Sequence, residues 1–244
     1  MKLIILNTWA GVLYKPLEKF VKEKSNEVDI FCFQEVFSGA VSTRKIRGKV
    51  IPNLYQKLQK VLPDFKCFYA ETEINDEGLA MFVNSTLEIE GYGVHFVYGY
   101  PNSMMGDDYT MKSSSVQYSL INSGKNLYTI INFHGLWTGG GKEDNEKRIL
   151  QSNNLKRFLK NVQGKKVLCG DFNLDITTKS LDILEDGMRN LIKENKVAST
   201  RSHYYKKDTK HADYILVSND IKVKKFEVLQ DVVSDHLPLF LDFV

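Results

Sequence analysis

The sequence has no long apolar run. Nowhere in its 244 residues do apolar side chains continue for the ~18 positions that a membrane-spanning helix needs. In the amino-terminal segment, residues 1–11, the apolar run has at most five residues, which is too short for the hydrophobic region of a signal peptide. The sequence therefore predicts a protein with neither a membrane anchor nor a secretion signal.

Cysteine is also scarce. The three cysteines are Cys32, Cys67 and Cys169, and each lies in an apolar, strand-like run. None of them has the CxxC spacing of a zinc site or redox motif, so buried free thiols are favoured over a disulfide or a bound zinc. Free thiols are typical of a reducing compartment, and we expect a cytoplasmic protein.

A strong excess of either charge is lacking as well. The formal net charge is +3, which permits a polyanionic partner without requiring one. Hydrophobic residues make up 43% and charged residues 26% of the chain, which are ordinary values for a globular protein. Because no low-complexity tract or flexible linker interrupts the chain, we expect a monomer with a single domain over residues 1–244.

The chain contains many short apolar segments with the length of strands. We expect strands at residues 2–6, 29–33, 66–71, 78–83, 87–99, 113–121, 127–133, 166–169, 213–218, 221–229 and 236–243. Helical spacing of apolar residues follows Pro16 and recurs at 54–62 and 149–162. This pattern predicts an α/β fold in which two mixed sheets pack face to face with helices outside, a four-layer α/β sandwich.

Polar side chains collect at the ends of these strands. They are Asn7, Glu35, Glu77, His134, Asp171, Asn173, Asp213, Asp235 and His236. Each alone has an ordinary explanation as a turn residue, a cap, a surface charge or a structural histidine. Because independent accidents rarely place nine such groups at the same kind of position, the set indicates a site.

Hydrolysis of a phosphate ester with a hard divalent cation needs these residue types. Mg²⁺ prefers oxygen ligands and keeps several waters, so one or two carboxylates are sufficient to hold it. A neutral amide can hold a phosphate oxygen, and a histidine with a carboxylate behind it can take a proton from water. Asp171 and Asn173 lie on the same side of an extended chain end and can offer their oxygens to one site.

Seven short motifs occur in order along essentially the whole chain. They are LNTW (6–9), FQEV (33–36), EGLAMF (77–82), NFHG (132–135), GDFN (170–173), DYIL (213–216) and SDH (234–236). In these motifs the sequence resembles the endonuclease/exonuclease/phosphatase superfamily, which includes pancreatic-type deoxyribonuclease, abasic-site endonucleases and neutral sphingomyelinases. The resemblance implies an enzyme that depends on Mg²⁺ or Mn²⁺.

The resemblance also implies roles for the site residues. Glu35 is similar to the main metal ligand, with Asn7 and Asp235 close to the metal or the phosphate. Asp171 and Asn173 resemble the pair that positions the nucleophilic water and the phosphate.

Two histidines have counterparts in the family. His236, oriented by Asp213, resembles the general base. His134, with Glu77 behind it as in the deoxyribonuclease branch, resembles the histidine that contacts the phosphate or assists the leaving group. The sequence leaves open which histidine acts as acid and which as base.

Two basic runs bear on the substrate. They are Arg44, Lys45, Arg47 and Lys49, and then Tyr204, Tyr205, Lys206, Lys207 and Lys210. Basic side chains beside aromatic ones suit binding to nucleic acid, although a solvated loop with no binding role can have the same composition. We expect substrate contacts from Arg44, Arg47 and Lys207, together with Asn7 and Asn173. Trp137 is either a further base-stacking contact or a core residue.

A competing signal favours a lipid. Residues 96–106 are rich in aromatic residues and methionine, and Trp9 follows Asn7 as in the sphingomyelinase branch. The pattern of residues 96–106 is also typical of an edge strand with a packed loop.

From the motifs and the basic runs together, we expect a metal-dependent phosphodiester hydrolase, namely a nuclease acting on DNA or RNA. The alternatives are a hydrolase of phospholipids or small phosphate esters and, least favoured because no carboxylate or histidine is missing, an inactive binding module.

Overall fold

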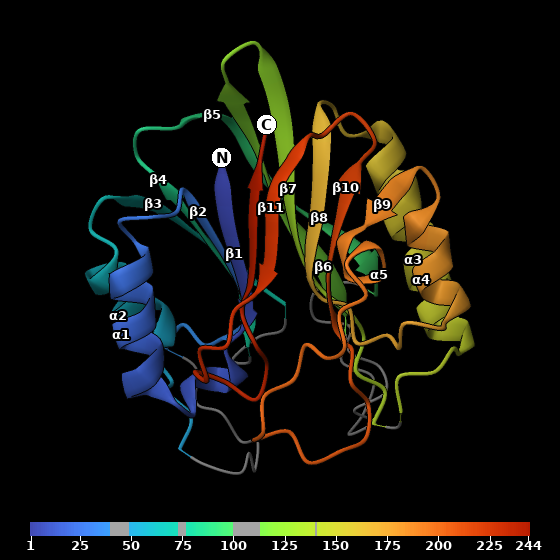
Figure 1. The fold of residues 1–244 in the computed structure, drawn as a ribbon, viewed down its shortest axis with the longest axis horizontal. Helices are drawn as coiled ribbons and strands as arrows, with labels where there is room; N and C mark the ends of the chain where they lie inside the picture. The colour runs from blue at the N-terminus through green and yellow to red at the C-terminus, as the bar shows by residue number, and fades with distance from the viewer. Residues whose placement is uncertain (40–48, 73–76, 100–112, 140) are drawn as a thin grey trace.

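Two six-stranded β-sheets lie face to face at the centre of the molecule (Figure 1). The computed structural model describes residues 1–39, 49–72, 77–99, 113–139 and 141–244. The strand order is β11-β12-β1-β2-β4-β3 in the first sheet and β5-β6-β7-β8-β10-β9 in the second. Each sheet contains one parallel pair of strands, β1 with β2 in the first and β7 with β8 in the second, and its other neighbours are antiparallel. Both sheets are therefore mixed, as expected.

The first sheet consists of β1 (Lys2–Asn7), β2 (Ile30–Val36), β3 (Phe65–Glu71), β4 (Gly78–Asn84), β11 (Val223–Val228) and β12 (Leu239–Phe243). The second consists of β5 (Glu88–Tyr98), β6 (Ser114–Ser123), β7 (Asn126–His134), β8 (Lys165–Asp171), β9 (Met188–Asn190) and β10 (Asp213–Ser218). The helices are the 3₁₀ turn η1 (Trp9–Gly11), α1 (Tyr14–Lys24), α2 (Leu54–Val61), α3 (Glu146–Asn161), α4 (Lys179–Glu185) and α5 (Leu191–Glu194).

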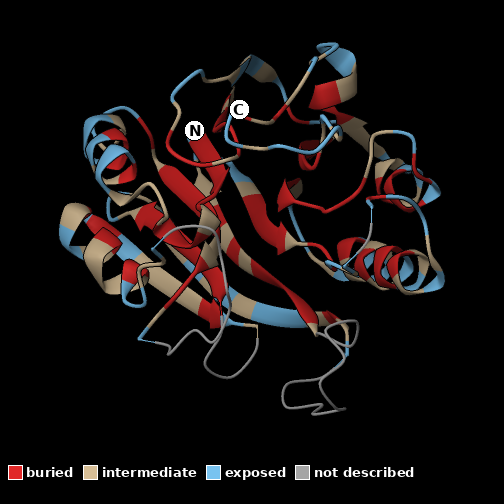
Figure 2. Ribbon diagram, turned by 90° about the horizontal axis from the view of Figure 1, so that it is seen from below, coloured by how far each residue is buried: buried red, intermediate tan, exposed pale blue. Residues whose placement is uncertain are grey.

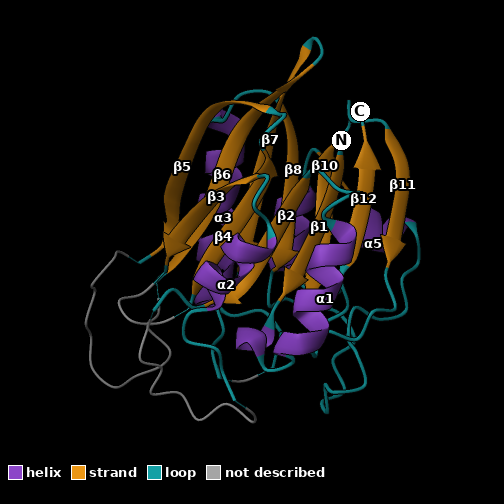
Figure 3. Cartoon of the chain, turned by 90° about the vertical axis from the view of Figure 1, so that its left-hand side faces the viewer, coloured by secondary structure: helices purple, strands orange, loops and turns teal. Residues whose placement is uncertain are grey.

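Helices cover the outer face of each sheet (Figures 2 and 3). Helices α1 and α2 lie on the side of the first sheet, and α3, α4 and α5 lie on the side of the second (Figure 1). This arrangement confirms the four-layer α/β sandwich. No helix in the described part of the chain is long and apolar enough to cross a membrane.

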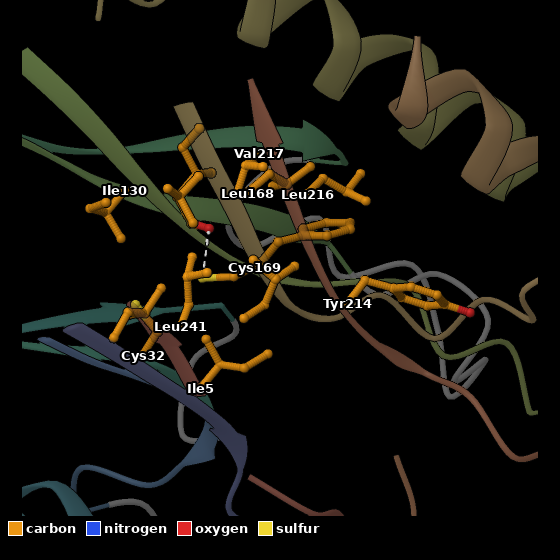
Figure 4. Packing of buried hydrophobic residues seen from close by; sticks show 14 of the residues in the cluster. Ile5, Cys32, Ile130, Leu168, Cys169, Tyr214, Leu216, Val217 and Leu241 are labelled. Atoms are coloured by element: carbon orange, nitrogen blue, oxygen red, sulfur yellow. Dashed lines mark hydrogen bonds between the residues drawn. The ribbon is translucent and has the colours of Figure 1, made fainter. Parts of the chain in front are cut away.

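The hydrophobic core fills the space between the sheets, and a second cluster lies under α1 and α2. In β1, Leu3 and Ile5 face the core between the sheets, whereas Ile4 and Leu6 face the helices. A strand buried on both faces reads as a continuous apolar run, which is why residues 2–6 show no polar alternation. Figure 4 shows Ile5 of the first sheet opposite the side chains of the second.

The three cysteines are free thiols, as expected. Cys32 and Cys169 are buried in the core between the sheets, and the Cys169 Sγ donates to the Ile131 carbonyl oxygen at 3.4 Å (Figure 4). Cys67 is half-buried. Burial raises the pKa of Cys32 and of Cys67, so neither carries the thiolate that a reactive cysteine needs.

The sequence pattern missed the short elements and placed one strand start wrongly. η1, α4, α5 and β9 were not expected, because each is too short to show a period. The last strand begins at Leu239 and not at residue 236. Residues 236 and 237 pair with the loop before β10 instead, since Arg201 forms a bridge with His236 and the Leu237 N–H donates to the Thr200 carbonyl oxygen at 2.9 Å.

Two glycines allow β7 and β8 to approach closely where they end. A Cβ at Gly170 would lie 2.0 Å from the Phe133 carbonyl oxygen, and one at Gly135 would lie 1.9 Å from the Phe172 carbonyl oxygen. Gly170 also has a φ of +139°, which side-chain-bearing residues rarely adopt. Only glycine fits at these positions, and the register it permits sets His134 beside Asp171.

We predict that Gly170→Ala destabilises the fold by the clash as well as by backbone strain. Gly187→Ala is the matched control, because Gly187 has a φ of +83° with nothing within 4 Å of an added Cβ. Overpacking typically costs about 1–3 kcal/mol, so Gly170→Ala should lower the free energy of unfolding by that much more than the control. Urea denaturation measures both, and equal losses would contradict the close approach.

Candidate active site

The polar side chains of the strand ends meet at one edge of the two sheets. Asn7, His134 and Asp171 end β1, β7 and β8, and Glu35 is the penultimate residue of β2. Asp213 begins β10, which runs antiparallel to β8, and it is paired directly with Asp171 across the two strands. Asp235 and His236 precede β12, which runs antiparallel to β1. This edge lies at the bottom of Figure 1 and faces the reader in Figure 2.

Asn7 links the two sheets. Its buried Nδ2 donates to Glu35 Oε1 at 2.9 Å within the first sheet and to Asp171 Oδ2 at 3.0 Å in the second. Glu35 lies in a β-bulge and has a φ of 54°, which is unusual for a residue other than glycine. Such backbone strain is common at functional sites, and here the bulge accompanies a carboxylate held beside the amide of Asn7.

His236, Asp213 and Thr200 form a buried hydrogen-bonded chain. The Nδ1 of His236 lies 2.8 Å from Asp213 Oδ1, and the Thr200 hydroxyl donates to Asp213 Oδ2 at 2.7 Å. Because an ionised carboxylate can only accept, we assign the proton of the neutral imidazole to Nδ1. The other nitrogen, Nε2, then carries a lone pair, lying 3.6 Å from Asp171 Oδ2 and 3.8 Å from Asp235 Oδ1.

Asp171 and Asn173 hold one another in place. The Asn173 N–H donates to Asp171 Oδ1 at 2.8 Å, and the Asn173 Nδ2 donates to the Gly135 carbonyl oxygen at 3.0 Å. Asn173 has a φ of 54°, so the chain turns sharply after β8. The two residues therefore lie together in one turn, and their shared role in positioning water and phosphate stays a prediction.

Burial and the neighbouring positive charges act on Asp171 in opposite directions. Burial alone would raise the pKa of Asp171, but the charges of four neighbours lower it well below its usual range; these are Lys142, His236, Arg201 and His134. Burial and Arg201 both act to lower the pKa of His236, and the carboxylates of Asp213, Asp235 and Asp171 outweigh them, so that it is raised.

Asp235 lies among carboxylates and cations. Burial is the main cause that raises its pKa; Glu35 and Asp171 act in the same direction, and His236 and Arg201 act against them. The carboxylates of Glu35, Asp171 and Asp235 thus share one edge, and the Asn7 amide turns its Nδ2 toward Glu35 and Asp171 while its Oδ1 accepts from the Trp9 N–H. Carboxylate oxygens of this kind fit a hard divalent cation.

One set of three residues has the spacing of a metal site: ligand atoms of Asp171, Asp213 and His236 all lie within 4.8 Å of one another. However, both oxygens of Asp213 already have partners, one in His236 and the other in Thr200. The arrangement is therefore better suited to moving a proton than to holding a metal, and the role of Glu35 and Asp235 as metal ligands stays a prediction.

Three site residues were missed in the sequence. Lys142 is buried and donates from Nζ to Asn173 Oδ1 at 2.6 Å, and burial lowers its pKa to about 8. The guanidinium of Arg201 contacts His236 Nε2 and lies 4.1 Å from the centre of the Tyr205 ring. Thr200 is the third. All three lie in loops without apolar periodicity. Their only signals in the sequence were that Lys142 ends the glycine-rich segment 139–142 and that Thr200 and Arg201 come shortly before the second basic run.

The remaining expected residues differ in outcome. His134 Nε2 lies 4.0 Å from Asp171 Oδ2, so His134 does belong to the site. Glu77 is buried just before β4, and its pairing with His134 stays a prediction. Trp137 is 45% exposed, which makes the core-residue alternative wrong. Lys207 is exposed, and Arg44, Lys45, Arg47 and residues 100–106 lie outside the described residues.

The comparisons with known proteins agree with this geometry. The model of the Endonuclease/Exonuclease/phosphatase family matches residues 6–236, and the chain belongs to that family. No curated protein matches the chain.

Solved structures share the fold over the whole chain. An endonuclease/exonuclease/phosphatase from Bacteroides vulgatus is 18% identical, with a TM-score of 0.75 and coverage of 100% of this chain and 98% of that one. A mannosyl-6-phosphatase from Bacteroides thetaiotaomicron is 16% identical, with a TM-score of 0.75 and coverage of 100% and 99%. D. rerio TDP2, complexed with single-strand DNA product, is 12% identical, with a TM-score of 0.74 and coverage of 100% and 98%.

We predict that Thr200→Val weakens the fold, because it leaves one oxygen of a buried carboxylate without its hydroxyl donor. Hydrogen bonds to charged groups contribute about 1.5–3 kcal/mol, and the free energy of unfolding should fall by that amount. Thr200→Ser keeps the hydroxyl and should stay close to the wild type. Chemical denaturation at neutral pH measures both variants, and an unchanged Thr200→Val would rule out this support for Asp213.

Proposed function

We propose that the protein is a divalent-metal-dependent phosphodiester hydrolase whose substrate is nucleic acid. The observation that carries the proposal is the buried His236–Asp213 pair: the His236 Nε2 lies toward Asp171 and Asp235, and Asn7 links Asp171 to Glu35. A proton acceptor is thus placed next to a cation site, as hydrolysis by an activated water requires.

Glu35 would hold the metal ion, Mg²⁺ or Mn²⁺, with Asn7 and Asp235 beside it. When bound, the ion would supply positive charge that polarises the phosphoryl group. Support comes from the carboxylates of Glu35, Asp171 and Asp235, which lie close enough for Glu35 and Asp171 to act on the pKa of Asp235. Asn7 donates to Glu35 and so fixes the orientation of the proposed ligand.

His236 acts as the general base in this proposal. Asp213 holds its Nδ1 proton and leaves the lone pair on Nε2, which the Arg201 guanidinium contacts in the structure and which would exchange this partner for the attacking water to accept its proton. Asp171, kept ionised by the surrounding cations, orients that water together with Asn173. His134, whose Nε2 also lies near Asp171 Oδ2, contacts the phosphate or assists the leaving group.

The substrate assignment is supported by charge and by one structural neighbour. The loop at residues 198–212 contains four basic residues and one acidic residue, and it carries Arg201 into the site. The neighbour D. rerio TDP2 was solved with single-strand DNA product. Buried cations beside an anionic site also suit a phosphate monoester, and the mannosyl-6-phosphatase neighbour makes a small phosphate ester the second candidate.

We predict that Glu35→Gln lowers both metal affinity and hydrolysis steeply, because it removes a charge and keeps the shape. Glu23→Gln, on the exposed face of α1, is the matched control. Calorimetric titration with Mn²⁺ and rates on plasmid, single-stranded DNA, RNA and bis-p-nitrophenyl phosphate test this. Full activity of the wild type in excess EDTA would contradict the metal requirement.

We predict that His236→Ala slows hydrolysis by ~10²–10⁴-fold, the usual contribution of a general base. Asp213→Asn should cause a related loss, since it releases the imidazole from its working tautomer. The double variant should lose little more than His236→Ala alone, because groups that act as one unit are not additive. The measurement is kcat/KM for the three variants with Mn²⁺ binding as a control; independent, additive losses would contradict the pair.

A further inference from the structure

Two aromatic side chains from distant parts of the chain meet beside Asn7. The ring of Trp9, in η1, lies with its centre 6.2 Å from that of Tyr204, in the loop before β10, and the ring planes are inclined by 46°. The centre of the His203 ring lies 4.4 Å from that of Tyr204. Tyr204 is 41% exposed, so the Trp9–Tyr204 pair forms an aromatic surface open to solvent.

The backbone of Trp9 is held in a strained conformation. Trp9 has a φ of 49° and Ala10 a φ of 53°, in the left-handed region that bulky side chains avoid. The Trp9 N–H donates to Asn7 Oδ1 at 2.9 Å, which ties this turn to the residue that links the sheets. Strain of this kind persists where the surroundings enforce it, and it is concentrated at binding sites.

Tyr204 is tied to the other side of the same site. The Ser202 N–H donates to the Asp235 carbonyl oxygen at 3.0 Å, and the Ser202 hydroxyl donates to the Ser234 carbonyl oxygen at 2.7 Å. The Tyr204 N–H in turn donates to the Ser202 hydroxyl at 3.3 Å. The aromatic surface is thus fixed relative to both Asn7 and the segment that carries His236.

The charge of the surroundings indicates what the aromatic surface binds. Aromatic faces attract either a flat ring or a quaternary ammonium group. The loop that carries Tyr204 also carries Arg201, Lys206, Lys207 and Lys210 against a single Asp208. These basic side chains favour a base attached to a polyanionic backbone over a cationic headgroup, and the carboxylates beside Asn7 belong to the proposed metal site, where the bound cation would offset their charge.

We propose that the Trp9–Tyr204 surface stacks with an unpaired nucleobase adjacent to the scissile phosphate, which makes the substrate single-stranded. The proposal rests on the function proposed above. In a duplex, neighbouring bases cover both faces of each base, so stacking on a protein ring requires an unpaired nucleotide. The strained turn then places the base-binding ring at a fixed position relative to Asn7.

The test uses a short single-stranded oligonucleotide with one hydrolysable phosphodiester bond, its other linkages being phosphorothioates. Two counterparts lack the base on the 5′ or on the 3′ side of that bond. The measurement is kcat/KM for the wild type and for Trp9→Leu, Trp9→Phe, Tyr204→Leu and Tyr204→Phe. The informative quantity is the ratio between the full and the abasic substrate, because a merely structural defect changes both rates alike.

The wild type should prefer one full substrate over its abasic counterpart by about 5- to 150-fold, the range of stacking on one aromatic side chain. The leucine variants should lose most of this preference, and the phenylalanine variants, which keep a ring, should retain it. A leucine variant with the full preference, or a wild type with none, would overturn the proposal. Cleavage of sphingomyelin that depends on the two rings would assign the surface to a choline headgroup and also overturn it.

Failure of the proposed function gives a different result. A wild type that hydrolyses other phosphate esters in the presence of Mn²⁺ but cleaves none of the oligonucleotides would overturn the nucleic acid assignment, and the base-stacking role with it. Cleavage of the oligonucleotides without discrimination between full and abasic forms would overturn the stacking role alone.

Discussion

The site depends on how two separate sheets are held at their common edge, and one amide makes that connection. Asn7 reaches from the first sheet to Glu35 beside it and to Asp171 in the second. Deeper between the sheets, Gln34 donates to the Asn132 side chain at 2.6 Å, and Asn132 donates to the Phe33 carbonyl oxygen at 3.1 Å. Apolar packing is non-directional and tolerates sliding, whereas buried polar pairs fix one register. The carboxylates are placed because the sheets cannot shift.

The same edge concentrates groups that destabilise the fold individually. Glu35 and Asn173 both have positive φ angles, and buried carboxylates crowd around Asp171 and Asp235. Lys142 and Arg201 lower the pKa of Asp171, whereas burial raises the pKa of Asp235. A rigid scaffold of twelve strands tolerates such a site because its core lies elsewhere, between Ile5 and its partners. Strain and unbalanced charge therefore mark the part of the molecule shaped by its chemistry.

The sequence carried information on the strands and their ends because these follow local rules. Strand β8 is an apolar run that ends in Asp171, and both features are visible in the residues themselves. Arg201 could not be placed in this way, since the path of its loop is determined by hydrogen bonds to residues 234–237 from more than thirty positions away. The late start of β12 has the same cause, because His236 pairs with Arg201 before the strand begins. Contacts between distant loops leave no periodic signal in the chain.

The position of β12 has a consequence for the order of folding. This strand lies between β11 and β1, so the pairing that completes the first sheet joins residues from opposite ends of the chain, such as Leu3 and Leu241. Contacts of such high sequence separation require closure of a very long loop and form slowly. His236 lies three residues before β12, and Asn7 ends β1. Assembly of the candidate site is therefore a late event in folding, and a chain that has formed only its second sheet has Asp171 without Asn7 or Glu35 beside it.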